Sequence, residues 1–143
     1  MNTKNGFEIT NNITPEEYME LRQVVCWSSF PLEQAAEGLK NSAVLCCFRD
    51  NGKPIAIGRA VSDHGYVVYI ADVIVRPEYQ GKGIGTRAIR FAKTLYEDWE
   101  KFTLVTPIDK KENVKFYTEK CGFRIESTER DGSVELFRFV LER

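Results

Sequence analysis

Residues 72–91 read D-V-I-V-R-P-E-Y-Q-G-K-G-I-G-T-R-A-I-R-F, and this stretch decides the fold. It begins with a β-branched run that ends at a proline, Pro77. A turn with three glycines follows, at Gly81, Gly83 and Gly85. Apolar residues then recur at helical spacing, at Ile84, Ala88, Ala92 and Leu95. We therefore predict a strand, a glycine loop and a helix in succession.

The glycine loop is suited to bind phosphate. Glycine has no Cβ, so backbone N–H groups can come close to a ligand. The first N–H groups of a helix lack internal partners and lie at the positive end of the helix dipole. Two commoner phosphate motifs do not fit. A P-loop needs Lys and then Ser or Thr after its last glycine, where this chain has Thr86 and Arg87. The dinucleotide fingerprint needs G-x-G-x-x-G, whereas the three glycines here are spaced G-x-G-x-G. A glycine-rich turn that binds nothing is the alternative.

Length and composition exclude several classes of protein. The chain has 143 residues, which predicts one domain over residues 1–143. Its 20 basic and 21 acidic residues leave no electrostatic footprint for nucleic acid or a membrane surface. No apolar run is as long as a membrane span, and residues 1–5 lack the apolar segment of a secretion signal, so we expect a cytoplasmic protein. Four cysteines without a C-x-x-C pair, and a single histidine, predict buried reduced thiols and no metal site.

Three further helices are predicted from their start and stop signals. Thr14–Glu17 has the residues of a capping box, with a proline at the first helical position. Pro31 opens a second, short helix. Asp109–Glu112 is another capping box, which opens the last helix, and Gly122 is suited to end it.

Seven strands are predicted from apolar or alternating runs, at residues 7–13, 43–48, 55–61, 66–75, 102–106, 124–127 and 134–139. Asp50-Asn51-Gly52 is expected to form a hairpin turn. The strand at residues 102–106 follows the glycine loop's helix. It should therefore lie parallel to the strand at residues 66–75, because the two are joined by a strand–helix–strand crossover.

Two motifs resemble those of a known family. Q-x-x-G-x-G at residues 80–85, preceded by V-x-P-x-Y at residues 75–79, resembles the acyl-CoA pyrophosphate loop of the GNAT N-acetyltransferase superfamily. F-Y-T-E-K-C-G-F at residues 116–123 resembles the F-Y-x-x-x-G-F signature of the family's last helix. The predicted order β-α-α-β-β-β-α-β-α-β-β is the GNAT order. The resemblance implies an α+β fold, an α/β/α sandwich with a mixed sheet of about seven strands, a splayed parallel pair and about four helices.

The resemblance also implies a site for acetyl-CoA, the only cofactor expected. Backbone groups of Val73, Ile74 and Val75 would pair with the pantetheine arm in the gap between the splayed strands. The pyrophosphate would be surrounded by Gln80, Gly81, Lys82, Gly83, Ile84, Gly85 and Thr86. Asn113 is a further candidate contact, although it does not clearly match the family's CoA-binding asparagine. Lys82 could add a point charge or simply be solvated.

The implied reaction is transfer of the acetyl group to a primary amine, expected to be that of a small molecule. Tyr117 would be the general acid that protonates the departing CoA thiolate, unless it is simply a packed core tyrosine. The acceptor amine must lose a proton, and Asp72 and Tyr69 are the candidates for the base. Asp72 is equally suited to be a structural hydrogen-bond acceptor.

The loop between the first two helices would bind the acceptor. Trp27, Ser28 and Phe30 lie in it, and the aromatic residues suit an amine with an apolar or aromatic body, unless they serve only as a lid or core. Two other functions stay open: acetylation of a protein amine, and a CoA-binding sensor without catalysis. A homodimer is also expected, through an apolar surface on the C-terminal strands formed by Phe137, Phe139 and Val140.

Overall fold

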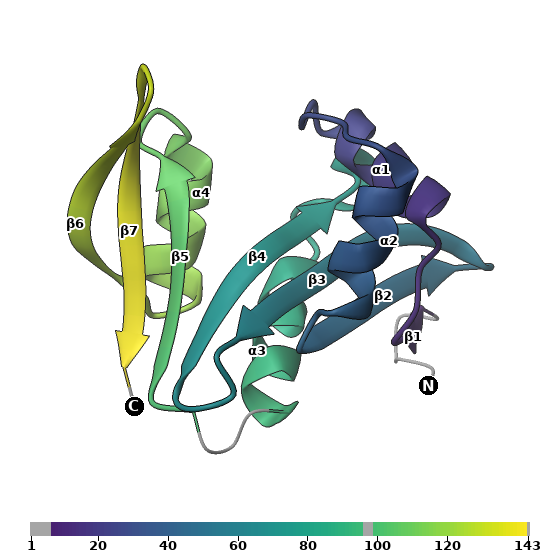
Figure 1. Ribbon diagram of the computed structural model, residues 1–143, viewed down its shortest axis with the longest axis horizontal. Coiled ribbons are helices and arrows are strands. Elements are labelled where there is room, and N and C mark those ends of the chain that lie inside the picture. Colours follow the sequence, from purple (N-terminus) through teal and green to yellow (C-terminus); the bar gives the residue numbers. More distant parts are fainter. Residues whose placement is uncertain (1–6, 96–98, 143) are drawn as a thin grey trace.

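The computed structural model describes residues 7–95 and 99–142, apart from the side chain of Leu95. The N-terminal residues 1–5 and the apolar side chain of Leu95, both used above, lie outside this description. A sheet crosses the molecule in the order β1-β2-β3-β4-β5-β7-β6 (Figure 1). Its strands are β1 (Glu8–Thr10), β2 (Val44–Asp50), β3 (Lys53–Ser62), β4 (Val67–Val75), β5 (Lys101–Pro107), β6 (Arg124–Asp131) and β7 (Val134–Glu142).

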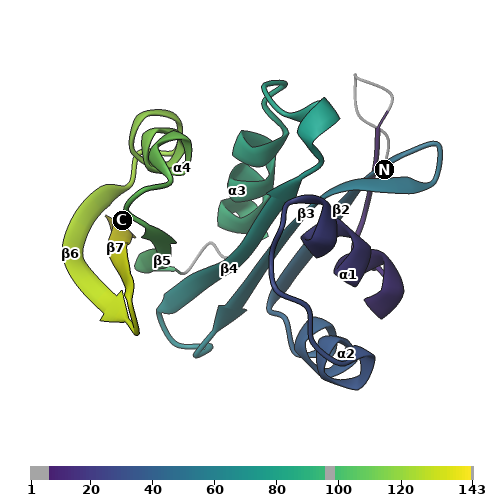
Figure 2. The same cartoon turned by 90° about the horizontal axis from the view of Figure 1, so that it is seen from above.

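Helices cover both faces of the sheet. They are α1 (Pro15–Val24), α2 (Leu32–Lys40), α3 (Ile84–Leu95) and α4 (Lys111–Lys115), with a short 3-10 turn, η1 (Pro77–Tyr79), and a π-helical turn, η2 (Phe116–Lys120). Seen from above, α1 and α2 lie on one side of the sheet, and α3 and α4 lie on the other (Figure 2). The predicted α/β/α sandwich with seven strands and four helices is confirmed.

Local sequence signals explain where several elements begin. The Thr14 hydroxyl accepts the Glu17 N–H at 3.1 Å, and a Glu17 carboxylate oxygen accepts the Thr14 N–H at 3.0 Å, which confirms the capping box of α1. Asn51 and Gly52 have φ of 51° and 83°, as a tight hairpin turn requires. The second predicted capping box is wrong: α4 begins at Lys111 after Lys110, and no side chain caps it.

The helix α3 lies unusually close to the sheet. A Cβ on Gly58 of β3 would be 2.9 Å from the Ala88 Cβ, so glycine at this position allows the close approach. The apolar face predicted for this helix is buried against β2, β3 and β4, with Ile84, Ala88, Ile89 and Ala92 all at 5% exposure or less. This packing fixes the position of the loop that precedes α3.

The parallel strands β4 and β5 pair over only three residues each, Val67–Tyr69 with Lys101–Thr103. Beyond that point the two strands diverge, so that the sheet opens into a V (Figure 1). Residues 70–75 of β4 therefore have only β3 as a strand neighbour in the described part of the chain. The predicted splayed pair is confirmed, and it leaves one backbone edge of β4 unpaired.

A β-bulge interrupts β4 where the strands begin to separate. Asp72 pairs with Arg59 and Ile70 pairs with Ala60, which leaves Ala71 as the extra residue. Side chains alternate between the two faces of a strand, so Tyr69 and Asp72 would face opposite sides of a regular strand. The extra residue places both on the face covered by α1 and α2.

Two expectations about side-chain exposure are wrong. Phe139 and Val140 are 0% and 1% exposed; β7 lies between β5 and β6, and Phe139 packs in the core against Tyr117. They therefore offer no surface for a dimer, and Phe137 is itself partly buried. The homodimer remains a prediction, but these three residues do not form its interface. Among the cysteines, Cys26 is exposed and only the other three are buried.

Candidate active site

The glycine loop leads from the end of β4 through η1 into α3. Gly81 and Gly83 both have φ of 79°, a conformation that residues with a Cβ rarely adopt. Apart from the adjoining residues, no atom of the described part of the chain lies within 4 Å of the place where a Cβ would be on either residue. The backbone of the loop is therefore open on that side, next to the N-terminal N–H groups of α3. This arrangement fits the diphosphate of a nucleotide-type ligand.

Other residues of the loop maintain its shape. The Gln80 side-chain amide donates to the Val75 carbonyl at 3.0 Å, which closes the turn around η1. The Lys82 ammonium lies 5.4 Å from the ring centre of Tyr79, whose hydroxyl donates to Asp50 at 2.6 Å. Gln80 thus has a structural role in addition to the contact expected from sequence.

The remaining predicted cofactor contacts differ in how much of each residue a ligand could reach. Ile84 and Ile74 are each 1% exposed, so only their backbone groups could reach a ligand. Val73 and Val75 are partly buried on the α3 side and lie on the unpaired edge of β4. Thr86 is partly buried and Asn113 is exposed on α4. The open edge of β4 and the glycine loop are therefore continuous, and a ligand that paired with the strand would lead directly to the loop.

Tyr117 lies in the core beneath the splayed strands. Its ring centre is 5.0 Å from that of Phe116, 5.9 Å from that of Phe123 and 5.7 Å from that of Phe139. Burial raises the pKa of the Tyr117 hydroxyl well above its usual value, and the negative charges that Cys121, Asp72 and Tyr69 can carry raise it further. The hydroxyl is therefore protonated at neutral pH, and no group in the described residues makes a hydrogen bond with it.

The helical stretch that carries Tyr117 is one residue longer than the signature it resembles. Four residues separate Tyr117 from Gly122, whereas F-Y-x-x-x-G-F has three. The extra residue is accommodated in η2, where the Cys121 N–H donates to the Phe116 carbonyl five residues earlier. The Thr118 hydroxyl donates to the Val114 carbonyl at 2.8 Å. This count of residues was a sequence signal for the π-helical turn.

Asp72 is fully engaged in a buried network. Its side chain is 3% exposed, and one carboxylate oxygen accepts hydrogen bonds from the Tyr18 hydroxyl and the Arg59 Nε, both at 2.6 Å. The other oxygen lies 3.6 Å from an Arg22 nitrogen. Tyr69 is partly buried on the same face, and its pKa is raised by burial. Asp72 therefore has a structural role as a hydrogen-bond acceptor, one of the two roles that the sequence allowed for it.

Arg22 connects this network to the predicted acceptor loop. Its Nε donates to the Ser28 carbonyl at 2.8 Å, and its guanidinium lies over the rings of Trp27 and Phe30. Neither Arg22 nor Arg59 was predicted from the sequence. The signal was weak, because only the i, i+4 spacing of Tyr18 and Arg22 on α1 hints at a shared face.

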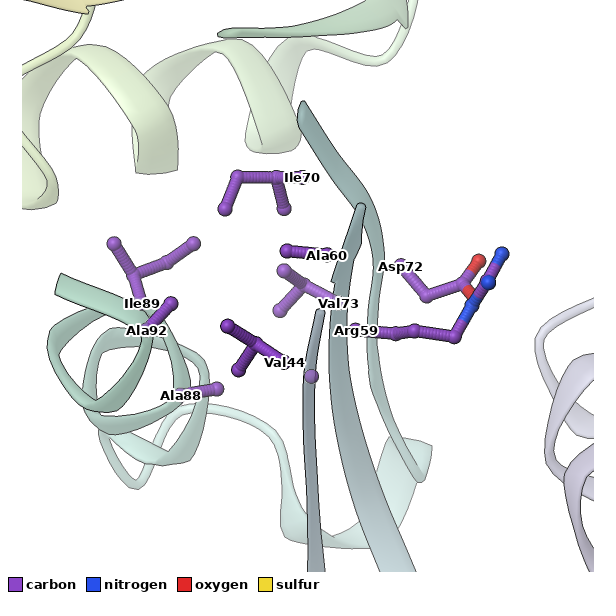
Figure 3. A pocket seen from close by; sticks show the side chains of 10 residues that line it. Val44, Arg59, Ala60, Ile70, Asp72, Val73, Ala88, Ile89 and Ala92 are labelled. Atoms are coloured by element: carbon purple, nitrogen blue, oxygen red, sulfur yellow. The ribbon is translucent and has the colours of Figure 1, made fainter. Parts of the chain in front are cut away.

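A cavity of about 10 Å³ lies under the bulge, between the sheet and α3. Figure 3 shows Ile70, Val73 and Ile89 around it, whereas the side chains of Arg59 and Asp72 extend from the opposite face of the strands. A space of this size holds about one water molecule. It is too small for a substrate and marks an imperfection in packing beside the bulge.

The described residues contain no group of three or more His, Cys, Asp or Glu side chains placed to hold a metal ion. In the same part of the chain, no helix has the length and apolar character needed to span a membrane.

Comparison with known proteins agrees with this geometry. The model of the acetyltransferase (GNAT) family matches residues 7–123. The chain belongs to the GNAT acetyltransferase family. The resemblance stated from sequence is thereby confirmed. Members of this family use acetyl-CoA, and a GNAT structure from Elizabethkingia anophelis contains it.

Individual GNAT relatives differ in length and likeness. An uncharacterized N-acetyltransferase, ycf52, of Pyropia yezoensis is 33% identical over 116 residues, which cover 78% of this chain and 66% of that protein. The chain thus spans just under two thirds of this relative's length. The GNAT acetyltransferase SP0256 from Streptococcus pneumoniae is 27% identical, with a TM-score of 0.73 over 87% of this chain and 94% of that one. Arabidopsis thaliana Naa50 is 15% identical with a TM-score of 0.81 over 96% and 99% of the two chains, which shows the fold alone.

Proposed function

We propose that this protein transfers an acetyl group from acetyl-CoA to the primary amine of a small molecule. One observation carries the proposal: the unpaired edge of β4 runs directly into an open glycine loop at the start of α3. An extended pantetheine arm can pair with such an edge as a missing strand would. The backbone of Val73–Val75 would hold the arm, and the loop at residues 80–86 would hold the diphosphate.

The proposed reaction is direct attack of the amine nitrogen on the thioester carbonyl. A C–N bond forms, the C–S bond breaks and the sulfur leaves with the electron pair. The nitrogen then gives up its extra proton, which returns through water to Tyr117. Tyr117 donates its hydroxyl proton to this sulfur, because a positioned general acid lowers the cost of expelling the thiolate. The raised pKa of Tyr117 means that its hydroxyl carries a proton at neutral pH.

The ammonium form of the acceptor must first lose a proton. Asp72 is a poor candidate for this step, because its carboxylate already accepts hydrogen bonds from Tyr18 and Arg59 inside the protein. Tyr69 shares the same face and is less buried. We therefore propose that the Tyr69 hydroxyl, which stays protonated because burial raises its pKa, holds a water molecule that carries the proton to solvent. Asp72 is assigned to the support of the acceptor loop.

The decisive experiment follows CoA release with a panel of small amines and a panel of peptides with free N-termini or lysines. Acetylation of a small amine supports the proposal. Acetylation of peptides alone would replace the small molecule with a protein acceptor. Stabilisation by acetyl-CoA without any acetylated product would indicate a sensor. A ligand at roughly 100 times its Kd stabilises the folded state by about 2.7 kcal/mol, which a melting experiment detects.

A further inference from the structure

Arg22 lies within a cage of aromatic rings. Its guanidinium carbon is 5.2 Å from the ring centre of Trp27, 4.8 Å from that of Phe30 and 5.7 Å from that of Tyr18. A cation within about 6 Å of an aromatic face is attracted to it, and aromatic cages of this kind bind ammonium groups of ligands. Here the cation that fills the cage belongs to the protein.

The hydrogen bonds of Arg22 hold this arrangement in place. Its Nε and Nη2 donate to the Ser28 carbonyl and hydroxyl at 2.8 Å and 3.3 Å. Its Nη1 donates to the Tyr18 hydroxyl at 3.3 Å and lies 3.6 Å from the Asp72 carboxylate. The side chain is only 12% exposed. Arg22 therefore fixes the loop at residues 26–30 against β4 and cannot leave the cage without losing these contacts.

The network around the cage carries an excess of positive charge. Two guanidinium groups, those of Arg22 and Arg59, share the single carboxylate of Asp72. Glu17 and Glu20 of α1 do not balance this charge, because they form ion pairs with Arg49 and Arg76. One net positive charge thus remains next to the loop.

We propose that Arg22 determines acceptor specificity: it makes the site select amines that carry no second positive charge. The inference rests on the proposed function, in which the loop at residues 26–30 lines the acceptor site. Arg22 already occupies the cage that would hold a distal ammonium group, and its charge repels such a group. The preferred acceptors then have a neutral or anionic body, and diamines are disfavoured.

The test compares two acceptors of equal chain length, butylamine and 1,4-diaminobutane, with acetyl-CoA as donor. For the natural protein we expect kcat/KM to favour butylamine by about tenfold, the size of an effect between two charges near a protein surface. Arg22→Met should remove this preference and shift the fluorescence of Trp27. Arg22→Lys keeps the charge and should retain most of the preference. Asp72 remains paired with Arg59 in both variants, so neither leaves a buried carboxylate alone.

Arg130→Gln is the matched control. Arg130 is exposed on β6, where it pairs with Glu135, and its loss removes one positive charge far from the cage. It should leave the ratio of the two kcat/KM values unchanged. The same comparison is made for the best acceptor of the amine panel, with and without a distal ammonium group.

Three results would overturn the inference. Equal kcat/KM for the two acceptors in the natural protein would show that no charge selection exists. An Arg22→Met variant that loses activity on both acceptors by the same factor would show that Arg22 only supports the loop. A natural protein that acetylates no amine would overturn the proposed function itself, and the inference with it, whereas the first two results leave the proposed function standing.

Discussion

The ring of Phe116 lies directly against Gly85. A Cβ on Gly85 would be 3.0 Å from the Phe116 Cζ, which is closer than such atoms normally approach. The contact joins the start of α3 to the π-helical turn that carries Tyr117. From the sequence, Gly85 was assigned to the diphosphate, and Phe116 was identified only as part of the signature of the last helix. The structure shows that these two residues also hold the proposed binding loop and the proposed general acid in a fixed relation.

Because of this contact, the effect of Gly85→Ala on the free energy of unfolding should depend on the residue at position 116. In the natural protein the added methyl group overpacks the contact, which should lower the free energy of unfolding by about 1 kcal/mol, measured by urea denaturation. In a Phe116→Leu background the methyl group has room. There the same change should be neutral or stabilise by up to about 1 kcal/mol, because alanine favours the helix over glycine. Equal effects in both backgrounds would show that the ring does not restrict position 85.

Gly83→Val should abolish the stabilisation by acetyl-CoA and leave a folded protein. Valine is strained at φ of 79°, and its side chain would extend into the open side of the loop. The strain alone should lower the free energy of unfolding by about 1–2 kcal/mol. Gly132→Val is the control, since Gly132 also has a positive φ and open space but lies in the β6–β7 hairpin. It should cost similar stability while the melting shift with acetyl-CoA persists.

Tyr117→Phe should lower kcat by roughly 10²–10⁴ while the Kd for acetyl-CoA changes little. The hydroxyl acts on a thiolate that exists only as the C–S bond breaks, so its loss affects the transition state far more than the bound ground state. The ring and its contacts with Phe123 and Phe139 remain. Tyr66→Phe, at an exposed position, serves as the control. An unchanged kcat would reject Tyr117 as the acid. A lower melting temperature with an unchanged kcat would identify Tyr117 as a core residue.

Acid should destabilise the protein partly through Glu17. A hydrogen bond from Arg49 lowers the pKa of Glu17 from 4.5 to about 2 in the folded state. A carboxylate with a lowered pKa contributes stability that is fully present above the unfolded value, pH 4.5, and is lost as the pH falls toward 2. Urea denaturation over this range should show a shallower loss of stability for Glu17→Gln than for the natural protein. Glu16→Gln, an exposed neighbour in the same helical turn, should follow the natural curve.

The glycine loop, its helix and the order of strands could be predicted because their signals are local. Glycines at positive φ, a capping box and strand periodicity each involve residues close in sequence. The cage around Arg22 could not be predicted in this way. Tyr18 and Asp72 are 54 residues apart, and their hydrogen bond exists only because α1 packs across β4. The same limit explains the wrong dimer surface: the sequence pattern of β7 does not reveal that another strand pairs on each side of it.

The bulge at Ala71 constrains how the length of β4 can change. Deleting one residue there would restore regular alternation and turn either Tyr69 or Asp72 to the α3 face. The bulge therefore shifts the alternation of side chains along β4. Side chains at odd-numbered positions up to 69, and at even-numbered positions from 72, face α1 and α2. Any redesign of the acceptor face must choose positions by this rule. A relative that keeps both side chains on one face must also keep the extra residue between them.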